Sequence, residues 1–86
     1  MGTPKRKKSS NNKAGLVDKY IGAQMREGRL SVGLSQSELA TKLGVTASQV
    51  RKYERGAIRV SAARLFVICE VMEVSLASMF ERKLKA

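Results

Sequence analysis

The chain has 86 residues, and its 17 Lys and Arg against 7 Asp and Glu give a formal net charge of +10. This length fits one small domain, and the charge favours a polyanionic partner such as DNA, RNA or an anionic membrane surface, although a charged surface that only keeps the chain soluble is the alternative. The single cysteine, Cys69, excludes an internal disulfide and a cysteine metal cluster, and no apolar run is long enough to span a membrane.

The first 15 residues carry basic side chains and no acidic one. Because almost nothing in this segment is apolar, burial would not repay the entropic cost of ordering it. We therefore expect residues 1–15 to form a disordered basic arm. A DNA-binding arm, a nuclear import signal and a solvated tail are the alternative roles of its basic cluster. That cluster is Lys5, Arg6, Lys7 and Lys8.

The first predicted helix runs from about residue 17 to 32, because apolar residues recur there at helical spacing. Gly33 follows as the predicted end of the helix, since glycine tolerates the left-handed conformation found there. The apolar residues that we expect on its inner face are Val17, Ile21, Met25 and Leu30.

Two short helices are predicted next. Ser35 with Glu38, and then Thr46 with Gln49, have the spacing of capping boxes, which mark the first turn of a helix. Each of these helices ends at a glycine. The two glycines are Gly44 and Gly56.

A fourth helix is predicted from Ser61 to about Glu73, and a short fifth helix after Ser75. We expect Leu65, Ile68, Cys69 and Met72 of the fourth helix to line the core, and the fifth helix holds Leu76, Met79 and Phe80. The sequence therefore predicts an all-α fold: a compact five-helix domain over residues 16–82, after the disordered arm and before a frayed C-terminus at residues 83–86.

Two short helices joined at Gly44, the second of them capped, form the helix-turn-helix pattern. The combined sequence pattern resembles the Cro/C1-type repressor family, also called the Xre family, over about residues 17–81. The pattern consists of Gly33-Leu34-Ser35-Gln36, Leu39-Ala40, Leu43-Gly44-Val45-Thr46, Val50 and Tyr53-Glu54-Arg55-Gly56. The resemblance implies a lambda repressor-like domain that inserts the helix at about residues 47–55 into the major groove of double-stranded DNA.

The resemblance also implies roles for single residues. Gln36 matches a glutamine that contacts the DNA backbone, and Ala47, Ser48 and Lys52 match positions that contact base edges. Ala47 departs from well-known relatives because it has no polar group, although it could pack on a thymine methyl. The full predicted DNA-binding set is Gln36, Thr46, Ala47, Ser48, Gln49, Arg51, Lys52, Arg55 and Arg59.

Arg29 and Glu54 match positions that form an ion pair between helices in some relatives. Glu54 is the only acidic residue of its predicted helix, and an unpaired carboxylate close to phosphate would oppose DNA binding. We therefore expect Glu54 to pair with Arg29 or Arg26 and to have a structural role.

The predicted function is sequence-specific regulation of transcription, as a repressor in the cytoplasm, at the nucleoid. A homodimer is expected because one short helix covers only a few base pairs. We expect its interface on the fifth helix and on the exposed side of the fourth helix, including Phe66 and Val67. An antitoxin or adaptor on the same fold, and an unspecific nucleic-acid binder, are the alternatives. The lack of histidine argues against an enzyme, and we expect no cofactor, metal, small-molecule ligand or membrane partner.

Overall fold

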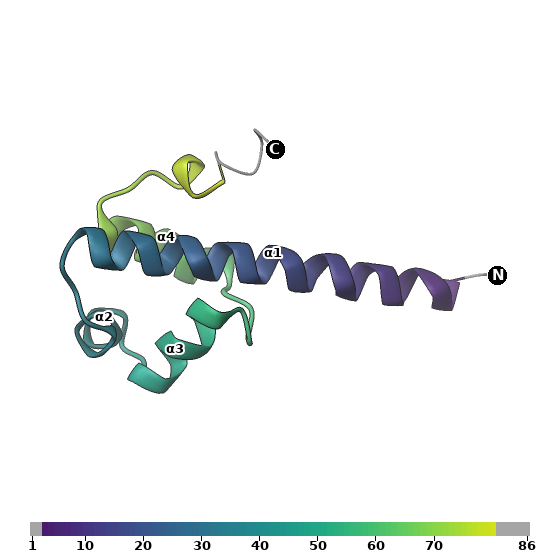
Figure 1. Cartoon of the computed structure of the whole chain (residues 1–86), viewed down its shortest axis with the longest axis horizontal. Helices are drawn as coiled ribbons and strands as arrows, with labels where there is room; N and C mark the ends of the chain where they lie inside the picture. The colour runs from purple at the N-terminus through teal and green to yellow at the C-terminus, as the bar shows by residue number, and fades with distance from the viewer. Residues whose placement is uncertain (1–2, 81–86) are drawn as a thin grey trace.

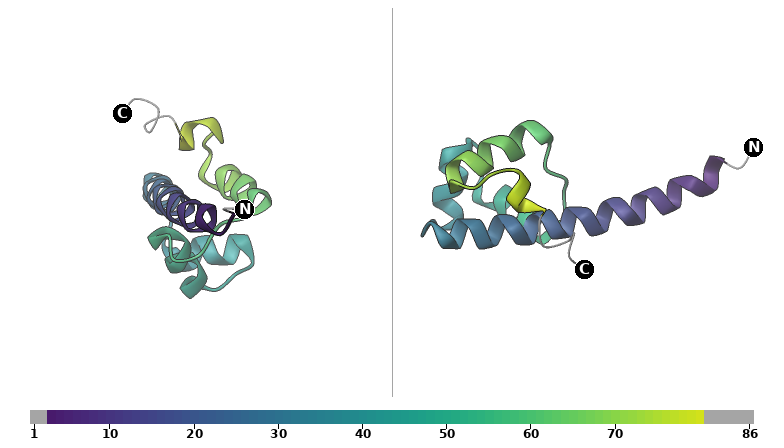
Figure 2. Two further views of the ribbon diagram at one scale, coloured as in Figure 1. Left: turned by 90° about the vertical axis from the view of Figure 1, so that its right-hand side faces the viewer. Right: turned by 90° about the horizontal axis from the view of Figure 1, so that it is seen from above.

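The computed structural model describes residues 3–80, with side chains from residue 15 onward. Within these residues there is no strand. In Figure 1, α2 and α3 lie below the long helix α1 and the turn η1 lies above it, while Figure 2 shows α4 beside α1. The elements are α1 (Thr3–Ser31), α2 (Gln36–Leu43), α3 (Ala47–Arg55), α4 (Ala62–Met72) and the short 3-10 helix η1 (Ala77–Met79).

The all-α prediction is confirmed, but the prediction of five α-helices is wrong for the described chain. The segment after α4 forms the three-residue 3-10 helix η1. Its hydrogen bonds join residues three apart, from Ser78 N to Ser75 O at 3.1 Å and from Met79 N to Leu76 O at 3.1 Å. A 3-10 turn of this kind is tighter than an α-helix and is used in short pieces.

Helix α1 begins nearer the N-terminus than the sequence indicates. It starts at Thr3 and continues without a break through the basic segment, for which composition alone favours disorder. Pro4 stands in the first turn, where its missing N–H costs nothing, and Lys and Arg are good helix formers. The first half of α1 projects away from the other helices (Figure 1). The predicted frayed end at residues 83–86 lies outside the described residues.

The helix ends follow local sequence signals. Ser35 Oγ accepts from Glu38 N at 3.0 Å, and Glu38 Oε1 accepts from Ser35 N at 2.8 Å, which completes the predicted capping box of α2. Gly44 ends α2 in the left-handed region, at φ 74°. The capping box predicted for α3 is only half formed: Thr46 Oγ1 accepts from Gln49 N at 3.1 Å, but the Gln49 side chain bonds elsewhere.

The core lies where α1, α2, α3 and α4 meet, and it contains the predicted residues of α4. Helical spacing predicts Val17 and Leu30 on the inner face of α1, but they are 50 % and 51 % exposed. Met25 is buried as predicted, and the inner face runs through Gly22, Met25 and Arg29, which lie on one side of the helix. The largest fully buried side chains are Met25, Leu39, Ile68, Met72 and Val50.

Gly22 is the point of closest approach between α1 and α3. A Cβ atom at this position would lie 2.3 Å from the carbonyl oxygen of Tyr53 and 2.6 Å from that of Glu54. Both neighbours are backbone atoms, so a larger residue would have to push α3 away from α1. Gly22 therefore sets the distance at which α1 supports α3.

We predict that Gly22→Ala lowers the free energy of unfolding by about 1–3 kcal/mol, the cost of overpacking a close contact. Gly15→Ala is the matched control in the same helix, because nothing lies within 4 Å of a Cβ there. The control should be neutral or stabilising by less than about 1 kcal/mol, since alanine favours a helix over glycine. Urea unfolding followed by circular dichroism measures both. Equal stability of the two variants would contradict the close approach at Gly22.

Candidate nucleic-acid interface

Helix α3 presents one polar face to solvent. Ser48, Arg51, Lys52 and Arg55 are all exposed, and their spacing places them on the same side of the helix. Val50 and Tyr53 on the opposite side are buried in the core. Thr46, which caps the helix, is also exposed. The face thus offers two hydroxyl groups and three positive charges.

Ala47 and Gln49, which the sequence also predicts as DNA contacts, are half-buried. Ala47 packs against the hydrophobic core. Gln49 Nε2 donates to the hydroxyl of Tyr53 at 3.2 Å, so part of its amide is already engaged within α3. Both residues present less of their surface than Ser48 and Lys52 do.

A buried ion pair joins α3 to α1. Arg29 Nε donates to Glu54 Oε2 at 2.7 Å, and Arg29 Nη2 donates to Glu54 Oε1 at 3.1 Å. Arg29 Nη1 also donates to the carbonyl oxygen of Leu34 at 2.9 Å. The side chains of Arg29 and Glu54 are only 7 % and 3 % exposed. Two parallel bonds between a guanidinium and a carboxylate form the strong, directional kind of ion pair.

Gln36 lies at the start of α2 and is half-buried. Its Nε2 donates to Glu54 Oε1 at 3.0 Å, so the first residue of α2 is tied to the same carboxylate as Arg29. Its predicted contact with the DNA backbone stays a prediction. Within the fold, Gln36 supports the ion pair.

The charge of Glu54 is therefore held on the inner side of α3. It is the only acidic residue of that helix, and its carboxylate is covered by Arg29 and Gln36. The exposed charged side chains of α3 are Arg51, Lys52 and Arg55, all of them cations. An approaching polyanion meets positive charge on α3 without a facing carboxylate.

Arg59 lies in the loop between α3 and α4 and pairs with α1. Its Nε lies 3.2 Å from Asp18 Oδ1 and 3.3 Å from Asp18 Oδ2. The Arg59 side chain is 66 % exposed, whereas that of Asp18 is 13 % exposed. The two residues are 41 positions apart, and no local pattern in the sequence indicates the contact.

The single cysteine, Cys69, is buried in the core, and burial raises the pKa of its thiol. Among the described residues, no group of His, Cys, Asp and Glu could hold a metal ion. Within the same part of the chain, no helix has the length and apolar character needed to cross a bilayer. Lys5, Arg6, Lys7 and Lys8 lie on the projecting part of α1, outside the residues whose side chains are described.

The arrangement of α2, Gly44 and α3 defines a helix-turn-helix protein. The helix-turn-helix family model matches residues 25–78. The chain therefore belongs to this family, in its Cro/C1-type branch, as its resemblance to Xre proteins indicates.

Several curated relatives are named HTH-type transcriptional regulators. The y4aM protein of Sinorhizobium fredii is 44 % identical over 80 % of this chain and 48 % of its own length. A regulator of Sinorhizobium medicae is 36 % identical over 84 % of this chain and 52 % of its own length. The chain thus spans about half the length of these relatives.

Among solved structures, the clp gene regulator ClgR of Corynebacterium glutamicum is similar to this chain. The two superpose with a TM-score of 0.71 and 28 % identity, over 74 % of this chain and 68 % of that one. The likeness covers most of the described helices, so it supports the same architecture for both proteins.

We predict that Glu54→Ala lowers the free energy of unfolding by about 3–5 kcal/mol, because it leaves the buried guanidinium of Arg29 without its partner. Arg59→Ala breaks an exposed ion pair and should cost only about 0–1 kcal/mol. Urea unfolding compares the two variants.

Replacing both charges together, as Arg29→Met with Glu54→Leu, serves as the second arm of this test. It should recover much of the stability lost in Glu54→Ala, since no charge is then left buried alone. If Glu54→Ala lowers the free energy of unfolding by no more than Arg59→Ala does, the structural role of Glu54 is contradicted.

Proposed function

We propose that the chain binds double-stranded DNA by inserting α3 into the major groove, and that it regulates transcription in this way. The observation that carries the proposal is the exposed face of α3, where Ser48, Arg51, Lys52 and Arg55 stand together while Glu54 is turned inward. A helix fits the major groove, and there Lys and Arg bind guanine while Ser binds several bases. The names of the relatives support the same activity.

We further propose a homodimer. Helix α3 has nine residues, so one copy covers only a few base pairs, and two copies on half-sites one helical turn apart double the contacts. Phe66 and Val67 on α4 are 55 % and 41 % exposed, and Leu76 before η1 is 46 % exposed. Met79 of η1 is buried, so the apolar surface that we propose for a second copy lies on Phe66, Val67 and Leu76.

Repression in the cytoplasm, at the nucleoid, is the mode of regulation that we propose. A dimer that fills the major groove excludes other proteins from the same base pairs, so occupancy alone suffices for repression. The basic residues Lys5 to Lys8 would add phosphate contacts if the projecting part of α1 follows the DNA backbone.

Selection of bound duplexes from a random pool tests the proposal. We expect a palindromic motif whose half-sites are separated by about one helical turn. Lys52→Gln should then weaken binding to the selected duplex by roughly tenfold, because one base contact contributes about 1–3 kcal/mol of discrimination.

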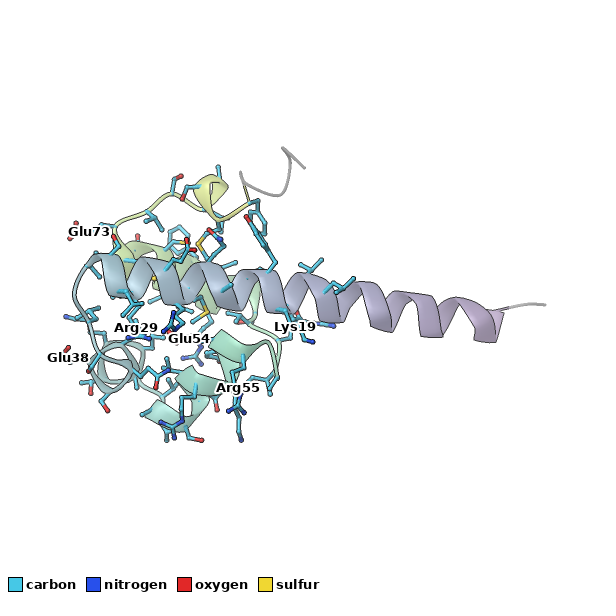
Figure 3. All side chains as sticks on the ribbon, viewed as in Figure 1. Lys19, Arg29, Glu38, Glu54, Arg55 and Glu73 are labelled. Carbon is cyan, nitrogen blue, oxygen red and sulfur yellow. The ribbon has the colours of Figure 1, made fainter. Side chains whose placement is uncertain are left out.

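The control variant is Glu73→Gln, which changes an exposed residue at the end of α4, on the opposite side of α1 from Arg55 (Figure 3). It should bind the selected duplex as the parent chain does. If no motif is enriched, or if Lys52→Gln binds as tightly as Glu73→Gln, insertion of α3 into the groove is wrong.

A further inference from the structure

A second group of cations lies where α1 passes the C-terminal end of α3. Gly56 ends α3 at φ 72°, and a Cβ there would lie 2.6 Å from the Cα atom of Lys19. The two helices are therefore in direct contact at this point. Lys19 is exposed, and Figure 3 shows it on the side of α1 that faces α3, the helix that carries Arg55.

Arg59 belongs to the same region, because it binds Asp18, the residue before Lys19. Asp18 engages only the Nε of Arg59, and both Nη groups have no hydrogen-bond partner among the residues described. The Asp18 carboxylate is largely covered, while the guanidinium is 66 % exposed. Asp18 thus holds one edge of Arg59 and leaves its outer edge for another ligand.

We call Lys19, Arg55 and Arg59 the basic corner. Its three cations come from three separate segments: α1, α3 and the loop after α3. All three side chains are exposed, and the basic corner lies at the C-terminal end of the exposed polar face of α3. The free Nη groups of Arg59, with the Arg55 guanidinium and the Lys19 ammonium, are suited to phosphate oxygens.

We propose that the basic corner binds a phosphate of the DNA backbone next to the groove segment occupied by α3, with Lys19 as the contact supplied by α1. This inference rests on the proposed function, since it concerns the same duplex. Phosphate contacts fix the position of a protein on DNA but do not distinguish sequences. Lys19 therefore contributes affinity and register, while Ser48 and Lys52 contribute specificity.

A purely structural role for Lys19 leads to a different expectation. The carbonyl groups at the C-terminal end of α3 carry partial negative charge, and a nearby lysine stabilises such an end. In that case Lys19→Gln would lower the stability of the fold and leave the salt dependence of DNA binding unchanged. The salt dependence is the property that separates the two roles.

The test measures fluorescence anisotropy of the selected duplex and of a random duplex from low to high salt. Lys19→Gln should weaken binding to both duplexes by a similar factor, roughly three- to tenfold, and lower the slope of log K against log salt by about 0.9, the value for one lost phosphate contact. Asp18→Asn keeps an acceptor for Arg59 but removes a negative charge from the corner, so it should tighten binding.

Glu73→Gln is the matched control for Asp18→Asn, because it removes the same charge far from α3 and should change nothing. If the slope of log K against log salt is unchanged in Lys19→Gln, the inference is overturned. It is also overturned if Lys19→Gln binds more weakly only to the extent that its unfolding temperature is lower. If Lys52→Gln still weakens binding in either case, the proposed function stands without the basic corner. If the parent chain binds neither duplex, both proposals fail together.

Discussion

The buried ion pair between Arg29 and Glu54 is the interaction on which the geometry of the molecule depends. It joins α1 to α3, and through Leu34 O and Gln36 Nε2 it also holds the turn after α1 and the start of α2. Burying two charges costs desolvation energy, which is offset only when the geometry is good and the remaining polar atoms are bonded. Glu54 meets these conditions, since both of its oxygens accept hydrogen bonds. The pair favours one relative placement of the three helices.

The same pair links the fold to the proposed activity. By holding the one carboxylate of α3 inward, it leaves Arg51, Lys52 and Arg55 to define the charge of the exposed face. Gly22 complements this by allowing α1 to approach the backbone of α3 closely. A nine-residue helix has little stability of its own, so its position on the surface comes from these contacts with α1.

Features encoded by neighbouring residues were predictable from the sequence. Ser35 with Glu38, and Gly44, act within one or two turns of chain, and the helix boundaries that they predict for α2 agree with the structure. The same holds for Ser48, Arg51, Lys52 and Arg55 on the exposed side of α3, because Val50 and Tyr53 define its buried side, whereas Ala47 and Gln49 are half-buried. The family pattern placed Arg29 near Glu54, which spacing alone could not do.

Features that depend on distant residues were not predictable in this way. Val17 and Leu30 have helical spacing but lie off the inner face of α1, which is set by where α3 and α4 pack. Gly22 has no local signature, because its role is to leave room for carbonyl groups of another helix. The bond from Gln49 to Tyr53 competes with the expected capping box, and the pairing of Arg59 with Asp18 spans 41 positions.

The most direct test of the central claim is an NMR titration of the chain with its selected duplex, which follows each backbone amide separately. The account predicts that the largest shifts cluster at Thr46, Ser48, Arg51, Lys52 and Arg55, while Met25 and Ile68 in the core stay nearly unchanged. Shifts concentrated on Phe66 and Val67 of α4, with α3 unaffected, would contradict the claim that α3 is the surface that enters the groove.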